Sequence, residues 1–206
     1  MPTEDTFISS TGRPLPPAAV AWIRHFKMER IPQEGAWFAP AFQSDETIAA
    51  GSFSARYPTP RLAYNSIYGV QTTDDFSGLH RLRSDELWHH YEGSPVQLLM
   101  LYPDGHGEIS VLGHDLAAGQ RPQWRVPRGV WQGSRPLGGD AACALIGNSM
   151  APGFDYGDFE VGYREELQAQ YPAFSDLIAE LTRDEHGRRR DERSRKGCRR
   201  AFLHGK

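Results

Sequence analysis

The segment from Phe76 to Gly93, FSGLHRLRSDELWHHYEG, concentrates side chains able to move protons, with three histidines and several acids within eighteen residues. In a β-strand, alternate side chains face the same way. A strand over residues 86–92 would place on one face Glu86, Trp88, His90 and Glu92, and on the other Leu87, His89 and Tyr91. Because neither face is purely apolar, we expect one of them to line a polar pocket.

His80 and Glu86 are the first candidates for catalytic residues. A turn predicted at residues 84–85 would form a hairpin and bring His80 beside Glu86. A neutral imidazole next to a carboxyl group suits proton transfer or metal binding. The alternatives are a histidine hydrogen-bonded within a barrel wall and a glutamate in a structural ion pair with Arg81 or Arg83.

Further candidates come from the same strand and from two later segments. His90 is the third catalytic candidate, because it is predicted on the face that carries Glu86, whereas His89 is predicted to point outward. Trp88, on that face, and Trp131 are candidate substrate-binding residues, with a place in the core as the alternative. Gln132 and Asp155 complete the substrate-binding candidates. Asp155 could orient His80, or it could form an Asx turn after Pro152 and Gly153.

The elements that must position these residues are mainly short strands. From about residue 61 to 150, alternating segments are punctuated by Gly, Pro and Asp, which predicts an all-β sandwich or barrel. The PDG sequence at 103–105 predicts a hairpin. Residues 17–30 predict a short amphipathic helix that begins after two prolines, and two helical segments separated by Pro172 follow residue 160.

Length and charge indicate one domain with tails. We predict a disordered lead-in over residues 1–17, the domain over 18–182 and a basic disordered tail over 183–206. From Arg183 to Lys206 there are ten Lys or Arg and four Asp or Glu, a balance of +6, so the net charge of −3 leaves −9 for the other residues. An acidic body argues against a nucleic-acid surface. The tail could still make weak contacts with an anionic polymer or a membrane.

Other sequence features favour a cytoplasmic protein. There is no apolar run of about 20 residues to span a membrane, and the first ten residues lack the apolar core of a secretory signal. The cysteines Cys143 and Cys198 are too far apart in sequence to suggest a metal-ligand motif.

Two segments resemble the metal-binding motifs of the cupins. The first motif has two histidines separated by one residue, then a glutamate, six residues and a glycine. His80 and Glu86 fit this pattern, but Leu82 replaces the second histidine. The second motif, Pro-x-Gly-x-x-His, is similar to PRGVWQ at 127–132, where Gln132 replaces the histidine. The resemblance implies a partly dismantled metal site that retains His80 and Glu86, with Gln132 as a weak oxygen ligand.

A wider resemblance covers roughly residues 18–183. In the same order as the signature blocks of the DUF985 (Cupin_5) family, the chain carries IPQEGAWF (31–38), FSGLHRLRSDELWHHYEG (76–93), MLYPDG (100–105), LGHDLAAGQRPQWRVPRGVWQG (112–133) and APGFDYGDFE (151–160). The resemblance implies a cupin double-stranded β-helix, a jelly-roll barrel that is commonly homodimeric and has a small-molecule pocket at one mouth. The GLH around His80 is also similar to the segment that carries the base of dTDP-sugar 3,5-epimerases, a metal-free cupin branch.

The pocket supports three functional hypotheses. The first is an isomerase, epimerase or cyclase of a sugar-like or carboxylated metabolite, with His80 as base and Glu86 or His90 orienting it or returning the proton. The second is a module that binds a small molecule without converting it. The third is a metal-dependent dioxygenase or decarboxylase that uses His80, Glu86 and Gln132. Loss of two imidazole ligands favours chemistry without a cofactor, and a divalent metal is left open.

Overall fold

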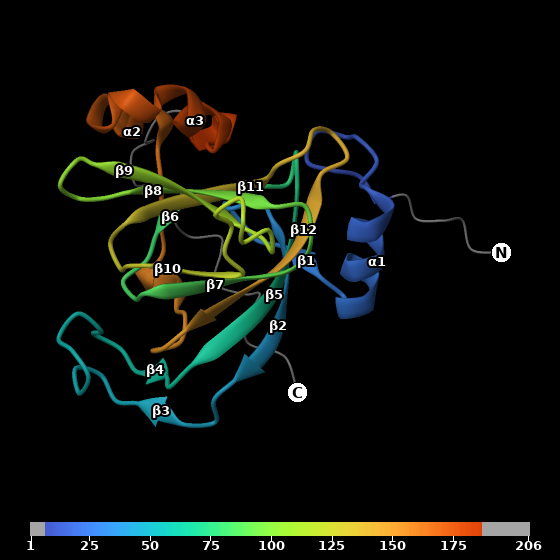
Figure 1. The fold of residues 1–206 in the computed structure, drawn as a ribbon. Coiled ribbons are helices and arrows are strands. Elements are labelled where there is room, and N and C mark those ends of the chain that lie inside the picture. Colours follow the sequence, from blue (N-terminus) through green and yellow to red (C-terminus); the bar gives the residue numbers. More distant parts are fainter. Residues whose placement is uncertain (1–6, 187–206) are drawn as a thin grey trace.

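Two antiparallel sheets form the body of the protein, for which the computed structural model describes residues 7–186. The six-stranded sheet has the order β1-β2-β5-β12-β7-β10, and the five-stranded sheet has the order β13-β6-β11-β8-β9 (Figure 1). The first contains β1 (Glu29–Arg30), β2 (Trp37–Gln43), β5 (Asn65–Thr72), β7 (Glu86–Gly93), β10 (Gln123–Val126) and β12 (Cys143–Met150). The second contains β6 (Ser77–Arg81), β8 (Val96–Leu101), β9 (Gly107–Leu112), β11 (Trp131–Pro136) and β13 (Glu160–Val161). The predicted all-β jelly-roll class is confirmed.

Short elements complete the fold. A separate two-stranded sheet contains β3 (Thr47–Ile48) and β4 (Arg61–Leu62), and the α-helices are α1 (Pro17–Phe26), α2 (Arg164–Gln170) and α3 (Ser175–Glu180). The 3-10 turns are η1 (Tyr156–Asp158), η2 (Pro172–Phe174) and η3 (Asp184–His186). Within residues 7–186, no helix has the length and apolar character that crossing a membrane requires.

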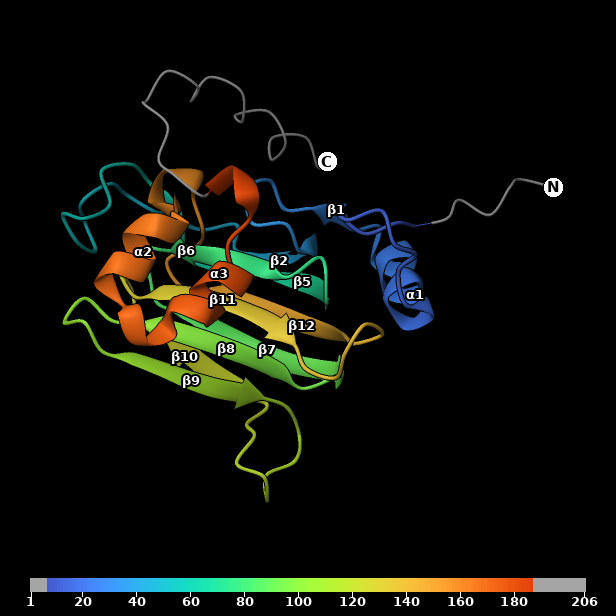
Figure 2. The ribbon, with the colours of Figure 1, turned by 90° about the horizontal axis from the view of Figure 1, so that it is seen from above.

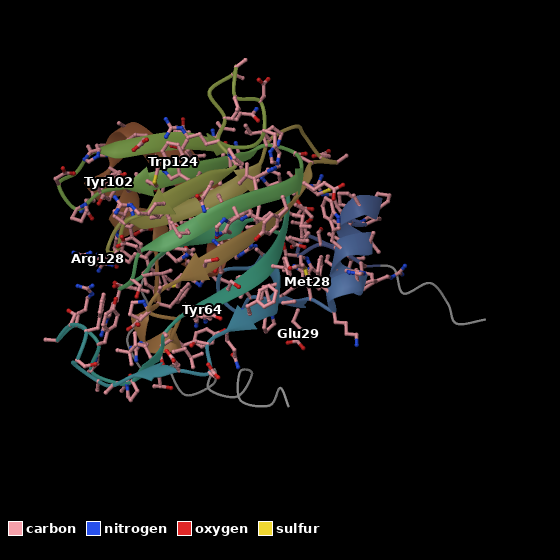
Figure 3. The ribbon with its side chains drawn as sticks, turned by 60° about the horizontal axis from the view of Figure 1, so that its bottom comes forward. Met28, Glu29, Tyr64, Tyr102, Trp124 and Arg128 are labelled. Carbon is pink, nitrogen blue, oxygen red and sulfur yellow. The ribbon has the colours of Figure 1, made fainter. Side chains whose placement is uncertain are left out.

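The interior between the sheets is a tightly packed apolar cluster. Trp88 on β7 is 1% exposed, and Met100 on β8 is fully buried beside it in the same cluster. Tyr102, which follows β8, and Trp124, on β10, pack at its rim from the two different sheets (Figure 3). Burying one large apolar side chain contributes about 1.5–3 kcal/mol. This cluster therefore holds the two sheets together around the polar residues that they carry.

Helix α1 covers the outer face of the six-stranded sheet. Its first residue is a proline, which tolerates that position because the N–H it lacks has no partner in the helix. Ala19 and Ile23 are buried against Val70 and Leu145 of the sheet. The predicted helix is confirmed, although it ends at Phe26 because Lys27 adopts the left-handed conformation, with φ of 54°.

Helices α2 and α3 cover the outer face of the five-stranded sheet (Figure 2). Leu167 and Ile178 of these helices pack in one buried cluster with Leu99 and Trp131. The two predicted C-terminal helices and the break between them at Pro172 are confirmed. Trp131 therefore belongs to the packing under the helices, which is the core alternative of its prediction.

The predicted hairpins have different outcomes. Strands β8 and β9 form the hairpin predicted from PDG, with Gly105 at φ of 94° in the turn. The predicted hairpin between β6 and β7 is wrong. Strand β6 pairs with β11 and β13, whereas β7 pairs with β10 and β12. Residues 82–85 instead carry the chain from one sheet to the other, so His80 and Glu86 belong to opposite walls of the barrel.

The predicted disordered lead-in covers residues 1–17, and residues 7–17 of it have defined contacts. Leu15 is buried against α1, and the backbone N–H of Ser10 donates to Asp75 over 2.8 Å. Arg13 forms an ion pair with Asp74. The predicted tail over 183–206 lies mostly outside the described residues, as do residues 1–6.

Candidate functional site

A cavity of about 70 Å³ lies between the sheets at one end of the barrel. A water molecule needs about 10–15 Å³ of cavity volume, so the cavity suits a ligand the size of about five waters. Its lining contains polar and apolar residues: Ile31, Glu34, Phe38, Asn65, Ser66, Ile67, His80, Leu82, Glu86, Asn148, Met150, Phe154, Tyr156 and Phe159. The cavity brings together two of the predicted catalytic residues, His80 and Glu86.

His80 presents one ring nitrogen to the cavity. Its Nδ1 lies 2.8 Å from the carbonyl oxygen of Gly78, and its ring stacks on Phe159 with centroids 5.2 Å apart. Because a carbonyl can only accept a hydrogen bond, Nδ1 carries the hydrogen. The Nε2 atom of the neutral ring therefore keeps its lone pair, and it lies 4.0 Å from Oε2 of Glu86. This tautomer is the one that a general base at Nε2 requires.

Glu86 is fixed by a chain of hydrogen bonds that starts at Trp88. The indole Nε1 of Trp88 donates to Oε1 of Gln132 over 2.8 Å, and Nε2 of Gln132 donates to Oε2 of Glu86 over 2.5 Å. An indole N–H can only donate, so it turns the amide oxygen of Gln132 toward itself and the amide N–H toward Glu86. Trp88 thereby positions a residue of the cavity without lining it.

The environment of Glu86 favours its neutral form. Glu86 is 7% exposed. Burial raises the pKa of its carboxyl to about 7, the positive form of His80 lowers it, and the negative charge of Glu34 raises it further. A carboxyl with this pKa can donate a proton near neutral pH and accept one back.

Asn148 adds an unsatisfied donor to the cavity. It lies on β12, is 7% exposed and lines the cavity. Its Nδ2 atom has no hydrogen-bond partner among the described residues. A buried amide without a partner is costly, so this donor favours a ligand with an acceptor oxygen.

The segment from β12 to β13 covers the cavity and is held from both sides. It contributes Phe154, Tyr156 and Phe159 to the lining. The backbone N–H of Phe154 donates to Oδ1 of Asn65 over 3.0 Å. Asp158, in the middle of the segment, receives two hydrogen bonds of 2.8 Å from the buried guanidinium of Arg61. This segment, residues 151–161, is the roof of the cavity.

The other predicted site residues lie elsewhere. His90 shares the inner face of β7 with Glu86, as predicted, but it is not part of the cavity lining. Its Nε2 bonds the carbonyl oxygen of Ser94 over 2.9 Å, and its ring lies 5.0 Å from that of His114. Glu92, predicted on the inner face, is exposed because a bulge interrupts the pairing of β7 with β12 near Tyr91.

Two predicted substrate-binding residues, Trp131 and Asp155, are also outside the cavity. Trp131 packs under α2 and α3, and Arg81 stacks on its ring at 4.4 Å. Asp155 forms the Asx turn that was the alternative, since its Oδ1 accepts from the N–H of Gly157 over 2.7 Å. His80 is oriented by a backbone carbonyl instead. Gln132 faces the interior but reaches the cavity only through Glu86.

The side chains around His80 do not fit a transition-metal site. His80 and Glu86 supply two donors, but Leu82 has none, and the amide oxygen of Gln132 is engaged by Trp88. Among residues 7–186 no group of three or more His, Cys, Asp or Glu is arranged to hold a metal ion. Transition metals in proteins are held by several such ligands, so no chemical step is assigned to a metal here.

Sequence reasoning missed several cavity residues. Glu34 and Phe38 lie in the first signature block, and Phe154, Tyr156 and Phe159 lie in the last. No site role was predicted for these five residues, because the phenylalanines carry no titratable group and all five lie far in sequence from His80. Asn148 lies two residues before the end of β12, in a strand for which the sequence predicted no site role.

A second hollow, of about 250 Å³, lies beside the N-terminal segment and contributes no candidate. Its charged residues pair with one another: Arg13 pairs with Asp74, and with Asp140 over 3.1 Å. Solvent-exposed pairs of this kind contribute little energy and leave no unsatisfied group for a ligand.

A two-sheet jelly roll is the architecture of cupins and of several other protein classes. The chain belongs to the Cupin superfamily (DUF985) family, Cupin_5, which matches residues 20–162. The family prediction is therefore confirmed.

Relatives match between 61% and 80% of the chain. An uncharacterised protein of Saccharomyces cerevisiae is 28% identical over 134 residues, which cover 61% of this chain and 66% of the yeast protein. A solved hypothetical protein from Leishmania major has a TM-score of 0.70 and 29% identity, covering 80% of this chain and 98% of its own. The solved protein SO0799 from Shewanella oneidensis has a TM-score of 0.69 and 32% identity, covering 79% and 96%.

Proposed function

We propose that this cupin binds a small, hydroxylated carbonyl compound and moves a proton on it, as isomerases and epimerases of sugar-like molecules do. The observation that carries the proposal is the position of His80 Nε2, 4.0 Å from Oε2 of Glu86 across a small cavity. This separation is longer than a hydrogen bond. Because the two atoms do not bond each other, each can contact a different atom of a ligand that lies beside the pair.

The arrangement of the pair suits an exchange of protons. Neutral His80 takes a proton from the carbon next to the carbonyl, and neutral Glu86 gives its proton to the carbonyl oxygen, which yields an enediol. Protonated His80 then gives its proton to the other carbon while the Glu86 carboxylate takes the proton of the other oxygen, which completes an isomerisation and restores both groups. An epimerisation requires the enediol to turn its other face to His80 before the proton returns. Such acid–base catalysis contributes typically about 10²–10⁴-fold to a rate. The Glu86 pKa of about 7 matches this task at neutral pH.

The lining favours a sugar-like ligand over a carboxylated one. Among the described residues that line the cavity, the formal charges come from Glu34 and Glu86, and none of the lining residues is a lysine or arginine. A buried ligand carboxylate would meet like charge without a cation to pair with. Asn148, by contrast, offers a donor to a hydroxyl or carbonyl oxygen.

Proton exchange in deuterated water tests the proposal. Glyceraldehyde, dihydroxyacetone and erythrulose are incubated with the protein, and deuterium entering the carbon next to the carbonyl is followed by NMR. We expect exchange with the wild type and about a 10²-fold or greater loss in His80→Gln. His106→Gln, which changes an exposed histidine paired with Asp104, is the control and should retain the rate.

Equal exchange rates for the wild type and His80→Gln would contradict the role of His80. The second candidate function is a module that binds such a compound without converting it, and the unsatisfied amide of Asn148 favours it as well. Thermal stabilisation by a compound that shows no deuterium exchange would select this second function, because a ligand stabilises the native state that binds it.

A further inference from the structure

Glu34 is a second carboxylate at the cavity, and neither the hydrogen-bond chain from Trp88 nor the acid–base pair uses it. It lies between β1 and β2, is half-buried and lines the cavity. Its Oε1 accepts a hydrogen bond from Oγ of Ser77 over 2.5 Å. Within residues 7–186 its carboxylate makes no direct ion pair with a lysine or arginine, although it interacts electrostatically with Glu86 and with Arg183.

The nearest guanidinium is directed at the backbone. Nε of Arg183 donates to the carbonyl oxygen of Glu34 over 3.2 Å, and its Nη2 donates to the carbonyl oxygen of Phe76 over 3.0 Å. Arg183 thus holds the segment that carries Glu34 without neutralising the carboxylate by direct contact. The cavity keeps an acidic side chain that is open to a ligand.

The rest of the lining complements a positive charge next to an oxygen atom. Four aromatic side chains line the same cavity: Phe38, Phe154, Tyr156 and Phe159. Aromatic rings attract cations through their negative faces. Asn148 is 7% exposed, and its unpartnered Nδ2 can donate a hydrogen bond to an acceptor oxygen on the ligand. Together these groups match a molecule with an ammonium group and hydroxyl or carbonyl oxygens.

We propose that Glu34 is a specificity-determining residue whose carboxylate binds a protonated amino group of the ligand, so that the cavity selects small amino alcohols or amino ketones. This inference rests on the proposed function, because it names the substrate class of the same cavity. The ammonium group lies at Glu34, and the oxygen-bearing end reaches Asn148, His80 and Glu86. A charge-assisted hydrogen bond in a poorly hydrated site is stronger than one between neutral groups.

A matched pair of probes tests the charge alone. Serinol (2-amino-1,3-propanediol) and glycerol have the same shape, and serinol carries an ammonium group at pH 7 where glycerol has a hydroxyl. Dissociation constants are measured from ¹H–¹⁵N chemical-shift changes. We expect serinol to bind the wild type about tenfold more tightly than glycerol, and Glu34→Gln to remove this difference. The Gln variant can still accept from Ser77, so it should fold.

Glu108→Gln is the matched control, since Glu108 lies on β9 and bonds Tyr102 and Ser110 outside the cavity. It should keep the preference for serinol. Equal binding of serinol and glycerol by the wild type, or an unchanged preference in Glu34→Gln, would overturn the inference and leave the proposed function standing. If neither compound shifts the resonances of cavity residues, the inference and the proposed binding function both fail.

A second readout reports the position of the bound charge. Glu86 faces these polar groups: Glu34 from the β1–β2 connection, His80 from β6, Gln132 from β11 and Tyr156 from the roof. Because the charge of Glu34 raises the pKa of Glu86, an ammonium bound at Glu34 should lower it. Saturating serinol should therefore shift the titration of Glu86 to lower pH, whereas glycerol should not. A shift of the same size with both probes would contradict the assignment of the ammonium to Glu34.

Discussion

Asp158 and Glu86 are two buried carboxylates with opposite surroundings. Asp158, in the roof, is 4% exposed and receives two hydrogen bonds from the equally buried Arg61. Glu86 is 7% exposed, receives a hydrogen bond from the neutral amide of Gln132 and faces His80 over 4.0 Å. The first carboxylate is compensated by a full positive charge, and the second is not.

This difference separates a structural acid from a reactive one. The guanidinium of Arg61 fixes Asp158 in a bidentate pair, which suits the anchoring of the roof to β4. Glu86 has a pKa of about 7 because burial penalises its charge and no fixed cation offsets the penalty. Perturbed groups of this kind, placed in a cavity, are typical of functional sites.

The largest expected effect comes from breaking the compensated pair. Asp158→Asn leaves the guanidinium of Arg61 buried without its carboxylate, so we expect a loss of about 3–5 kcal/mol in the free energy of unfolding. Urea denaturation at pH 7 measures it. A loss below about 1 kcal/mol would show that the pair does not hold the roof.

The next largest effect is expected from Glu86→Gln, which should raise the free energy of unfolding by an amount that depends on pH. Well below pH 4.5, Glu86 is protonated in both the folded and the unfolded protein. Between pH 4.5 and about 7, its carboxyl ionises in the unfolded protein but stays neutral in the folded one. The native state therefore loses stability as pH rises through this window, by up to about 3 kcal/mol. Glu86→Gln avoids this loss and should match the wild type at pH 4 yet be more stable at pH 8. If the variant and the wild type have equal free energies of unfolding at pH 4 and also at pH 8, Glu86 is not destabilised by its charge and does not differ from Asp158 in this way.

A smaller effect should follow from Trp88→Phe. The change keeps most of the apolar bulk in the core and removes the indole N–H that bonds Gln132. Leaving the buried amide oxygen without a donor costs about 1–3 kcal/mol. The substitution Trp124→Phe, at the rim of the same cluster, is the control and should cost less. Chemical denaturation of both variants compares them, and equal losses would count against the orienting role of Trp88.

The smallest effect is expected at an exposed pair. Arg81 and Glu160 are each 39% exposed in their side chains and lie 2.8 Å apart. Surface ion pairs contribute about 0–1 kcal/mol, so Glu160→Gln should change the unfolding free energy by less than about 1 kcal/mol. A larger loss, measured under the conditions used for Asp158→Asn, would mean that burial does not explain the difference between the pairs.

Sequence patterns predicted the fold well because its determinants are local or repeated. The PDG turn set the β8–β9 hairpin, and the prolines at 16 and 17 marked the start of α1. Alternation along β7 also placed Glu86 and Trp88 on the buried face correctly. It failed at Glu92, because one bulge reverses the facing of the residues beyond it.

The site was predictable only in part, since it depends on contacts between distant segments. His80 and Glu86 were paired correctly for the wrong reason: they meet across the barrel and not within a hairpin. Periodicity could not tell that the cavity ends before His90 on the same strand face. The roles of Glu34 and Asn148 arise from three-dimensional packing, which no short motif encodes.

The most direct test of the account is a carboxyl ¹³C NMR titration of Glu86, assigned with Glu86→Gln and recorded without ligand. We expect a midpoint near pH 7, because the carboxyl is buried without a fixed cation beside it. A midpoint near 4.5, the ordinary value, would contradict it, since Glu86 would then be charged at neutral pH and could not serve as the acid of the cavity.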